Sequence, residues 1–318
     1  MKKLLLITFI FLVYTSNSFA KPAKDSTWVE SSVTLETKTG TLYGTLCFPK
    51  NFTKGPVGMI IAGSGPTDRN CNSPMMKTDA YKMLAHQLAD NNIATFRYDK
   101  RGIGESKGAA NKETTLHFED LVNDANAWLQ LLKQDKRFTK IIVIGHSEGS
   151  LIGILIANNG ADEFISISGV GESGDKILKT QLMVQPKSVQ DSLFPIIDSL
   201  AAGKLVKNVN PNFNALFRAS VQPYLISWFK YNPANEIKKL TIPVLILQGT
   251  NDMQVSVDDA KMLKEADPKA KLILLDSMNH VFKIIKGDRT ENINSYSNPA
   301  LPIDPELPAD IGDFIYQD

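Results

Sequence analysis

The fold is decided by one stretch of sequence, residues 141–158, which reads IIVIGHSEGSLIGILIAN. Its first four residues are apolar and β-branched, which is typical of a buried strand, and its apolar second half predicts a helix. Between the two lies a G-x-S-x-G motif from Gly145 to Gly149. In this context the motif predicts a sharp strand-to-helix turn that exposes the Ser147 hydroxyl, with glycine where neighbouring backbone crowds the turn. A serine in an unreactive tight turn is the alternative, and the flanking strand and helix favour a nucleophile.

A serine nucleophile needs a base, and histidine suits this role because its pKa lies near neutral pH. The chain has four histidines, which are His86, His117, His146 and His280. When a serine follows a strand in this way, the acid and then the histidine come later in the chain. Only His280, in a loop after the last predicted strand, has this order, so we predict that it is the base.

The third member of such a triad is a carboxylate that orients the histidine ring. We assign it to Asp252, which follows the predicted strand 243–247 and so lies at the carboxyl edge of the sheet, where open α/β sheets place their sites. Asp258 and Asp259 are weaker candidates, because acidic residues are common at the start of a helix. Asp276 is also possible, but it lies only four residues before the histidine.

The negatively charged oxygen of a tetrahedral intermediate needs backbone N–H donors. One donor should be Glu148, the residue after the nucleophile, at the start of the helix. The second should come from the loop after the predicted strand 57–62, which begins Gly63-Ser64-Gly65-Pro66. We assign this donor to Ser64, with Gly65 as the alternative. The Glu148 side chain has a simpler interpretation, which is that it complements the helix dipole.

The rest of the chain alternates strands with helices, which predicts an α/β fold with parallel strands and right-handed crossovers. Several runs are apolar throughout, as expected for strands covered on both faces. The predicted strands are 33–37, 42–48, 57–62, 93–98, 141–144, 164–167, 243–247 and 271–275. The predicted helices cover about 78–91, 118–132, 151–157, 257–266 and 309–316. From about residue 172 to residue 240 the alternation of strands and helices stops. We predict that this segment is a helical insertion rich in aromatic residues.

The loop 99–106, DKRGIGES, carries acidic, basic and glycine residues but lacks the G-x-G-x-x-G of a dinucleotide site. We interpret it as structural: its glycines permit a tight loop, and Asp99 and Arg101 are expected to pin it by hydrogen bonds.

The N-terminus is typical of a secretory signal peptide. Two lysines precede an apolar run, residues 4–14, and Ser18 to Ala20 supplies small residues for cleavage. A retained anchor is the alternative, but a spanning helix needs about 20 apolar residues. We therefore expect residues 1–20 to be removed and residues 21–318 to form one domain with its insertion. The mature protein would be secreted or periplasmic, without stable membrane insertion.

The composition excludes some partners and leaves others open. A formal net charge of +1 gives no strong field, so nucleic acid is not an expected partner. The two cysteines, Cys47 and Cys71, either pair in an exported protein or stay unpaired. With no histidines clustered near them, a metal site is not expected, and no motif predicts a cofactor.

Three groups of residues resemble the triad segments of the α/β-hydrolase superfamily, namely Gly145–Gly149, Gly249–Asp252 and Met278–His280. The loop 99–106 resembles the loop after the fourth strand in that superfamily. Residues 63–70, GSGPTDRN, resemble a narrower group of bacterial esterases near the serine aminopeptidase and acyl-thioesterase-like branches. The resemblance covers nearly all of the chain after residue 30 except the insertion. It implies an eight-stranded sheet with helices on both faces, a helical lid at the insertion, and ester hydrolysis without a cofactor.

These residues favour a serine hydrolase that cleaves small-molecule carboxylic esters of small or medium acyl groups. A serine aminopeptidase or a thioesterase is the alternative, and a peptidase would need acidic residues for a free N-terminus, such as Glu172 and Asp175. A catalytically silent binding module is the third hypothesis, against which the intact triad argues. The substrate and the oligomeric state do not follow from the sequence.

Overall fold

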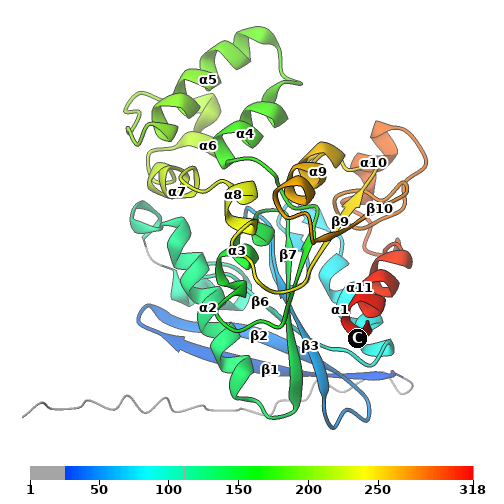
Figure 1. Ribbon diagram of the computed structural model, residues 1–318. Coiled ribbons are helices and arrows are strands. Elements are labelled where there is room, and N and C mark those ends of the chain that lie inside the picture. The colour runs from blue at the N-terminus through cyan, green and yellow to red at the C-terminus, as the bar shows by residue number, and fades with distance from the viewer. Residues whose placement is uncertain (1–25, 111, 318) are drawn as a thin grey trace, which may run out of the picture.

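A single large sheet forms the centre of the molecule (Figure 1). The computed structural model describes residues 26–110 and 112–317, so the predicted signal peptide lies outside the described residues. The strands of this sheet are β1 (Trp28–Thr37), β2 (Gly40–Pro49), β3 (Gly55–Ile61), β6 (Ala94–Tyr98), β7 (Phe138–His146), β8 (Glu163–Ile167), β9 (Val244–Gly249) and β10 (Lys271–Leu275). Each predicted strand is therefore present, and the structure extends most of them by a few residues.

The sheet has eight strands in the order β1-β2-β6-β3-β7-β8-β9-β10. The first two strands form an antiparallel hairpin, and β2 pairs antiparallel with β6. All other neighbours pair in parallel. The prediction of a mostly parallel eight-stranded sheet is thus confirmed. Because β3 and β7 lie side by side at its centre, the loop after β3 and the turn after β7 emerge together at the same edge.

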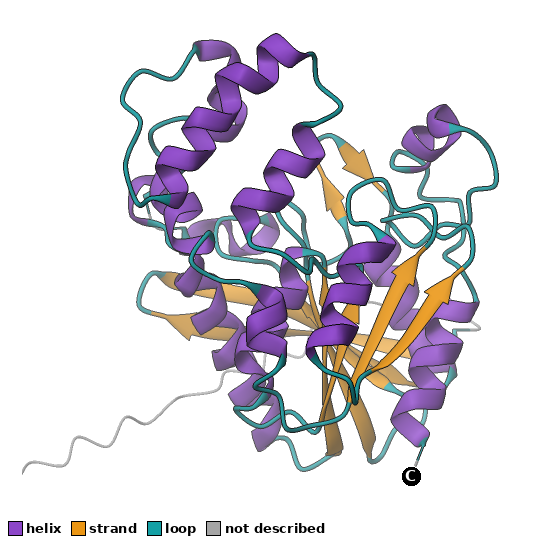
Figure 2. Ribbon diagram, turned by 45° about the horizontal axis from the view of Figure 1, so that its top comes forward, coloured by secondary structure: helices purple, strands orange, loops and turns teal. Residues whose placement is uncertain are grey.

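Helices cover both faces of the sheet, as Figure 2 shows. One face packs against α1 (Ala80–Asp90) and α11 (Glu306–Tyr316). The other packs against α2 (Phe118–Gln134), α3 (Glu148–Ala157) and α9 (Val257–Ala266). Alternate residues of β3 point to the two sides, with Met59 in one apolar cluster and Ile60 in the other. A strand buried on both faces must be apolar throughout, which explains the continuous apolar run.

The predicted insertion lies between β8 and β9, and in Figure 1 most of it occupies the upper left of the molecule, above α2 and α3. Its helices are α4 (Gly174–Leu182), α5 (Lys187–Ala201), α6 (Asn214–Phe217), α7 (Gln222–Trp228) and α8 (Pro233–Ile237). Buried apolar side chains of the insertion, among them Phe217 and Trp228, join the core on the α2 and α3 face. The insertion is therefore packed onto the domain rather than forming a separate core.

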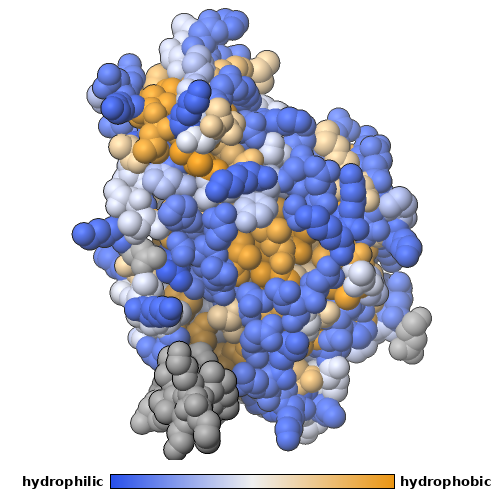
Figure 3. Space-filling model, turned by 60° about the vertical axis from the view of Figure 1, so that its left-hand side comes forward, coloured by the Kyte–Doolittle hydropathy of each residue, from blue (hydrophilic) through white to orange (hydrophobic). Residues whose placement is uncertain are grey.

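The insertion also carries apolar surface. Figure 3 shows apolar surface over the insertion, in the upper part of that view. Its exposed apolar side chains are Met183, Val184, Leu205 and Leu216. None of the helices within residues 26–110 and 112–317 is both long enough and apolar enough to cross a membrane.

Two small elements were not predicted. A hairpin of two-residue strands, β4 (Asn72–Ser73) and β5 (Met76–Lys77), follows β3, and a short helix, α10 (Arg289–Ser295), follows β10. Segments this short and polar give no readable hydrophobic period. The two cysteines are both buried, and neither forms a disulfide. The open question from the sequence is thus answered in favour of two free thiols.

Candidate active site

Ser147 lies at the tip of the turn between β7 and α3, in a strained backbone conformation with φ 55° and ψ −123°. Glycine is required on both sides of it. A Cβ on Gly145 would lie 2.3 Å from the carbonyl oxygen of Gly149, and a Cβ on Gly149 would lie 2.3 Å from that of Ile61. Positive φ is costly for a non-glycine residue and persists only where the surroundings impose it. The close packing of α3 on β3 imposes it here, and it leaves the Ser147 side chain half-buried at the sheet edge.

The structure brings Asp252 and His280 together. The His280 Nδ1 and the Asp252 Oδ2 are 2.8 Å apart, and the Asp252 side chain has no solvent exposure. The other carboxylate oxygen accepts N–H bonds from Gln254 at 2.8 Å and Val255 at 3.0 Å. Burial alone would raise the pKa of this carboxyl, but the His280 ring and the two amides together lower it to about 2. An ionised acceptor at Nδ1 makes that nitrogen the donor, so Nε2 is left free to accept a proton.

The other candidate acids have different partners. Asp259 completes a capping box with Ser256 at the start of α9 and accepts the N–H of Gly171. Asp258 pairs with Lys261, and the Asp276 carboxylate accepts a hydrogen bond from Ser277. None of the contacts that these three acids make is with the His280 ring.

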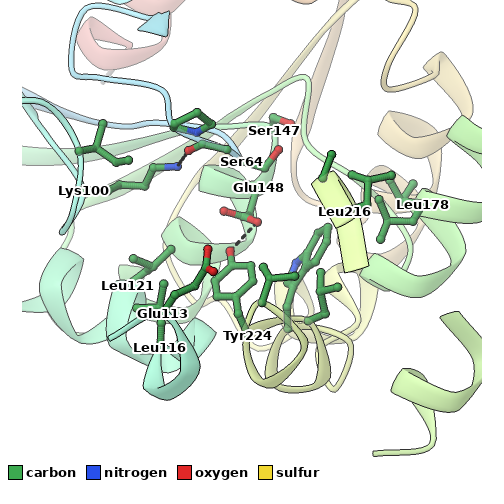
Figure 4. A pocket seen from close by; sticks show the side chains of 18 of the residues that line it. Ser64, Lys100, Glu113, Leu116, Leu121, Ser147, Glu148, Leu178, Leu216 and Tyr224 are labelled. Carbon is green, nitrogen blue, oxygen red and sulfur yellow. Dashed lines mark hydrogen bonds between the residues drawn. The ribbon is translucent and has the colours of Figure 1, made fainter. Parts of the chain in front are cut away.

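Two cavities meet at the serine. The larger, about 470 Å³, lies beneath the insertion, and its lining combines apolar side chains of α4, α6, α7 and the loops around them with a few charged ones (Figure 4). The smaller, about 180 Å³, is lined by His280 together with Tyr81, His146 and Gln254. Ser64 and Ser147 line both cavities, so the nucleophile lies where the two spaces join.

The predicted oxyanion donors also lie at this junction. Ser64 is exposed in the loop after β3, and Glu148 is the first residue of α3. A Cβ on Gly63 would lie 3.0 Å from the Cβ of Ser147, which shows how closely the loop approaches the nucleophile. Within the part of the chain that the structure describes, neither the Ser64 N–H nor the Glu148 N–H donates to a protein acceptor. Both are therefore available to a substrate oxygen.

The Glu148 side chain does more than complement a helix dipole. It is 3% exposed, and one carboxylate oxygen accepts a 2.7 Å hydrogen bond from the Tyr224 hydroxyl of α7, drawn as a dashed line in Figure 4. The other oxygen has no hydrogen-bond partner among the described residues. Burial raises the pKa of Glu148, and the charge of Lys100 opposes this. The residue after the nucleophile thus ties the insertion to the catalytic helix.

A hydrogen-bonded chain that the sequence did not reveal connects the two active-site loops. The Gly63 N–H donates to the Tyr81 hydroxyl at 3.1 Å, and that hydroxyl lies 2.7 Å from Nδ1 of His146. The other ring nitrogen of His146 lies 2.9 Å from the His280 carbonyl oxygen. Burial lowers the pKa of His146 well below its usual range, so the ring is neutral and we assign its proton to Nε2. In the sequence Tyr81 looks like an ordinary core position, which gave no signal of this role.

The loop 99–106 is pinned as predicted, with one addition. Asp99 accepts the backbone N–H groups of Arg69 and Glu105, and Arg101 forms a two-pronged pair with Asp124. Between these residues lies Lys100, which the sequence gave no reason to single out. Its ammonium reaches the loop after β3 rather than its own loop.

One group of described residues has the composition of a metal site. It consists of Glu30, Cys47 and His86, whose ligand atoms lie within 4.8 Å of one another. The guanidinium of Arg97 already donates to Glu30 at 2.6 Å, and the His86 ring donates to the same oxygen while stacking on Trp28. A resident guanidinium supplies the positive charge that a metal would bring, so these residues form an ion-pair cluster.

Comparisons with known proteins agree with this architecture. A family model described as serine aminopeptidase, S33, matches residues 75–211. An esterase of Thermotoga maritima, EstD, is 27% identical over 255 residues, which are 78% of this chain and 60% of that protein. A monoglyceride lipase of Mus musculus is 24% identical over 212 residues, which are 58% of this chain and 65% of that protein. The chain thus spans less than two thirds of the length of these curated relatives.

Solved structures support the fold. Est1E from Butyrivibrio proteoclasticus superposes with a TM-score of 0.55 at 17% identity, covering 83% of this chain and 94% of that chain. An esterase of Pyrococcus furiosus superposes with a TM-score of 0.57 at 15% identity, covering 90% of each chain. With the strand order and the strained serine turn, these matches show that the chain has the α/β-hydrolase fold.

Proposed function

We propose that the protein hydrolyses carboxylic esters of small or medium acyl groups by a serine mechanism. One observation carries the proposal: His280, which is paired with the buried Asp252, lines the same small cavity as the strained Ser147. The relatives named as an esterase and a lipase add support for ester substrates.

In this mechanism the Ser147 oxygen attacks the ester carbonyl while Nε2 of His280 takes its proton. Asp252 accepts the Nδ1–H of the ring, which leaves Nε2 free to take the proton, and it stabilises the imidazolium that forms. The N–H groups of Ser64 and Glu148 donate to the negatively charged carbonyl oxygen. His280 then gives the proton to the leaving alcohol, and a water molecule releases the acyl group by the same steps in reverse.

The two cavities have different roles in this proposal. The leaving alcohol must lie close to His280 to receive its proton, and His280 lines only the smaller of the two cavities. The alcohol therefore occupies the 180 Å³ cavity and the acyl group the 470 Å³ cavity beneath the insertion. The apolar lining of the larger cavity suits a hydrocarbon chain, and the insertion acts as its lid.

A peptidase would need a carboxylate that faces the site to bind a free N-terminus. The acids suggested by the sequence, Glu172 and Asp175, do not line either cavity, and Glu172 pairs with Lys176. Two other carboxylates do line the larger cavity, Glu113, which pairs with Arg218, and Glu148, which accepts the Tyr224 hydroxyl. Comparing an aminoacyl amide with a simple ester therefore separates a peptidase from an esterase. A thioester would use the same groups, so comparing an ester with the thioester of the same acyl group separates these two readings.

Replacing the nucleophile tests the proposal. Ser147→Ala should abolish the turnover of a short-chain p-nitrophenyl ester, because no other group can form the acyl-enzyme. Ser188→Ala, on the exposed face of α5, is the matched control and should keep the wild-type rate. Wild-type activity in Ser147→Ala would disprove the proposed mechanism.

We also propose that the protein is exported and cleaved after Ala20. Lys2, Lys3 and the apolar run that follows support this. Intact-mass measurement of the protein recovered from the periplasm or medium should give a chain that begins at Lys21. A full-length chain that stays in the cytoplasm would contradict export.

A further inference from the structure

Lys100 is a buried lysine whose partners are backbone carbonyls. It is 5% exposed, and its ammonium donates to the carbonyl oxygens of Gly63 and, at 2.9 Å, Gly65. No carboxylate among the described residues pairs with it within salt-bridge distance. Burying a charge in this way is costly unless its surroundings compensate it. The two carbonyls flank Ser64, whose N–H is one of the two proposed oxyanion donors.

The geometry of the peptide bond links the Lys100 contact to that donor. The Gly63–Ser64 peptide is trans, so its C=O and its N–H point in opposite directions. An ammonium that holds the Gly63 oxygen therefore directs the Ser64 N–H away from Lys100. The N–H of Gly63 is held separately by the Tyr81 hydroxyl. The Gly63–Ser64 peptide is thus held at its oxygen, and the preceding peptide is held at its N–H. The Ser64 N–H therefore cannot turn without breaking a buried hydrogen bond.

Electrostatics give Lys100 a second effect on the same oxygen. Glu148 supplies the other N–H donor, and its own carboxylate is buried near the site. A negative charge there would raise the energy of a developing oxyanion. Lys100 and Glu148 both line the larger cavity, where Figure 4 labels them, and the charge of each favours the ionised form of the other. The ammonium therefore offsets the carboxylate while leaving the donors in place.

We propose that Lys100 is a positioning residue for the oxyanion site: it aims the Ser64 N–H through the Gly63 carbonyl and balances the Glu148 charge. This rests on the proposed ester hydrolysis and deepens it. The positioning role predicts that Lys100 stabilises the transition state and contributes very little to substrate binding. The reason is that a correctly aimed N–H donor acts mainly when negative charge develops on the substrate oxygen.

The test compares Lys100→Met with Asp124→Asn. The methionine keeps the length and apolar stem of lysine but removes the donors and the charge. Asp124→Asn weakens the Arg101 pair in the same loop without touching Gly63 or Gly65. In Lys100→Met, kcat for a p-nitrophenyl ester should fall about 10²- to 10³-fold with little change in KM, the loss typical of one oxyanion donor. Asp124→Asn should lower the melting temperature but keep kcat.

Two further readouts separate positioning from a purely structural role. The affinity for a trifluoromethyl ketone, which forms a tetrahedral adduct, should fall in Lys100→Met by a factor similar to kcat. Active-site titration corrects every rate for the folded fraction. If the methionine variant does not fold, Lys100→Gln, which retains an N–H donor but no charge, is measured in its place and should show an intermediate loss.

The charge effect has its own test in a double variant. Removing the Glu148 charge in Lys100→Met/Glu148→Gln should restore part of the lost kcat, because the unbalanced carboxylate is then gone. No recovery would overturn the electrostatic part of the proposal. A folded Lys100→Met enzyme with wild-type kcat and unchanged ketone affinity would overturn the positioning role of Lys100. That result would not affect the proposed function, provided that the wild type still hydrolyses the ester and Ser147→Ala does not.

Discussion

At the scale of single residues, the chemistry depends on a carboxylate that stays charged although it is buried. Asp252 has no exposed side-chain surface, yet the His280 ring and two backbone amides compensate its charge. The carboxylate can therefore hold the ring in one orientation without itself taking the proton. His146 shows the opposite effect, because burial keeps that ring neutral and fixes it as a bridge between Tyr81 and the His280 backbone.

Asp252→Asn should lower kcat for ester hydrolysis by about 10⁴-fold, the effect of this change in a serine protease triad, while KM changes little. The asparagine keeps the size of the side chain but favours the wrong ring tautomer of His280. Steady-state kinetics, corrected by active-site titration, provide the measurement. A loss of less than about tenfold would mean that another group orients the histidine.

The same variant should change how stability depends on pH. The folded pKa of Asp252 is about 2, whereas an unfolded aspartate has a pKa of about 3.9. Ionisation of Asp252 therefore stabilises the fold by about 2 kcal/mol above pH ~4, and this contribution is lost as the pH falls toward about 2. Urea unfolding between about pH 5 and pH 3 should show a shallower decline in Asp252→Asn than in the wild type.

The residues of the proposed triad could be chosen from the sequence because their positions follow chain order and strand ends, and the structure brings two of them, Asp252 and His280, together. Asp252 comes directly after β9, and His280 is the one histidine downstream of it. Lys100 and Tyr81 could not be predicted, because Lys100 bonds backbone carbonyls of another loop and Tyr81 bonds a backbone N–H of that loop and the His146 ring. Such contacts leave no residue pattern, so only the fold reveals them.

At the scale of elements, one hydrogen bond joins the insertion to the catalytic helix. The Tyr224 hydroxyl of α7 donates to the buried carboxylate of Glu148 at the start of α3. The Glu148 carboxylate has no other side-chain partner among the described residues. Breaking this bond would therefore leave a buried carboxylate without a donor, which costs its desolvation free energy. The position of the insertion over the larger cavity therefore depends on a residue adjacent to the nucleophile.

Tyr224→Phe should lower the free energy of unfolding by about 1–3 kcal/mol, because it leaves a buried carboxylate without its donor. Tyr231→Phe is the matched control, since its hydroxyl also joins the insertion to α2 but bonds the half-buried Glu119 at 3.2 Å. That control should cost less than about 0.5 kcal/mol. Equal effects of the two changes in chemical denaturation would contradict the importance of the Glu148 contact.

Most helices and strands could be predicted from the spacing of their apolar residues, and the elements that were missed have clear physical causes. The helix at 257–266 was predicted with its observed bounds, and in the structure a capping box of Ser256 and Asp259 marks its start. The β4–β5 hairpin and α10 escaped prediction because polar segments of two to seven residues carry no period. They are held instead by tertiary contacts, such as the Asn279 amide bonding Asn292 and Ser295 of α10.

At the scale of the whole molecule, the insertion and the domain together form the larger cavity, which receives the acyl group in the proposed mechanism. The larger cavity is bounded by the domain below and by α4, α6 and α7 above. The presence of this cavity could be anticipated from the sequence, because the alternation of strands and helices stops at residues 172–240. Its lining could not, because an aromatic residue of that segment can belong to the core alone, as Phe217 does, or to both the core and the cavity wall, as Trp228 does.

Val221→Trp should shorten the range of accepted acyl groups. Val221 is half-buried in the wall of the 470 Å³ cavity, and a larger side chain there takes space that a chain would occupy. The value of kcat/KM should fall more for a long-chain p-nitrophenyl ester than for the acetate, by about tenfold or more. An equal loss for both esters would show that the acyl group does not enter this cavity.

The central claim is that Ser147, activated by His280 and Asp252, is the nucleophile. The most direct measurement treats the folded protein with a fluorophosphonate probe and maps the adduct by peptide mass spectrometry. The account predicts one adduct, on Ser147, formed rapidly in the wild type, absent in Ser147→Ala and strongly slowed in His280→Ala. A folded wild-type protein that takes no label, or that takes it on another serine, would contradict the claim.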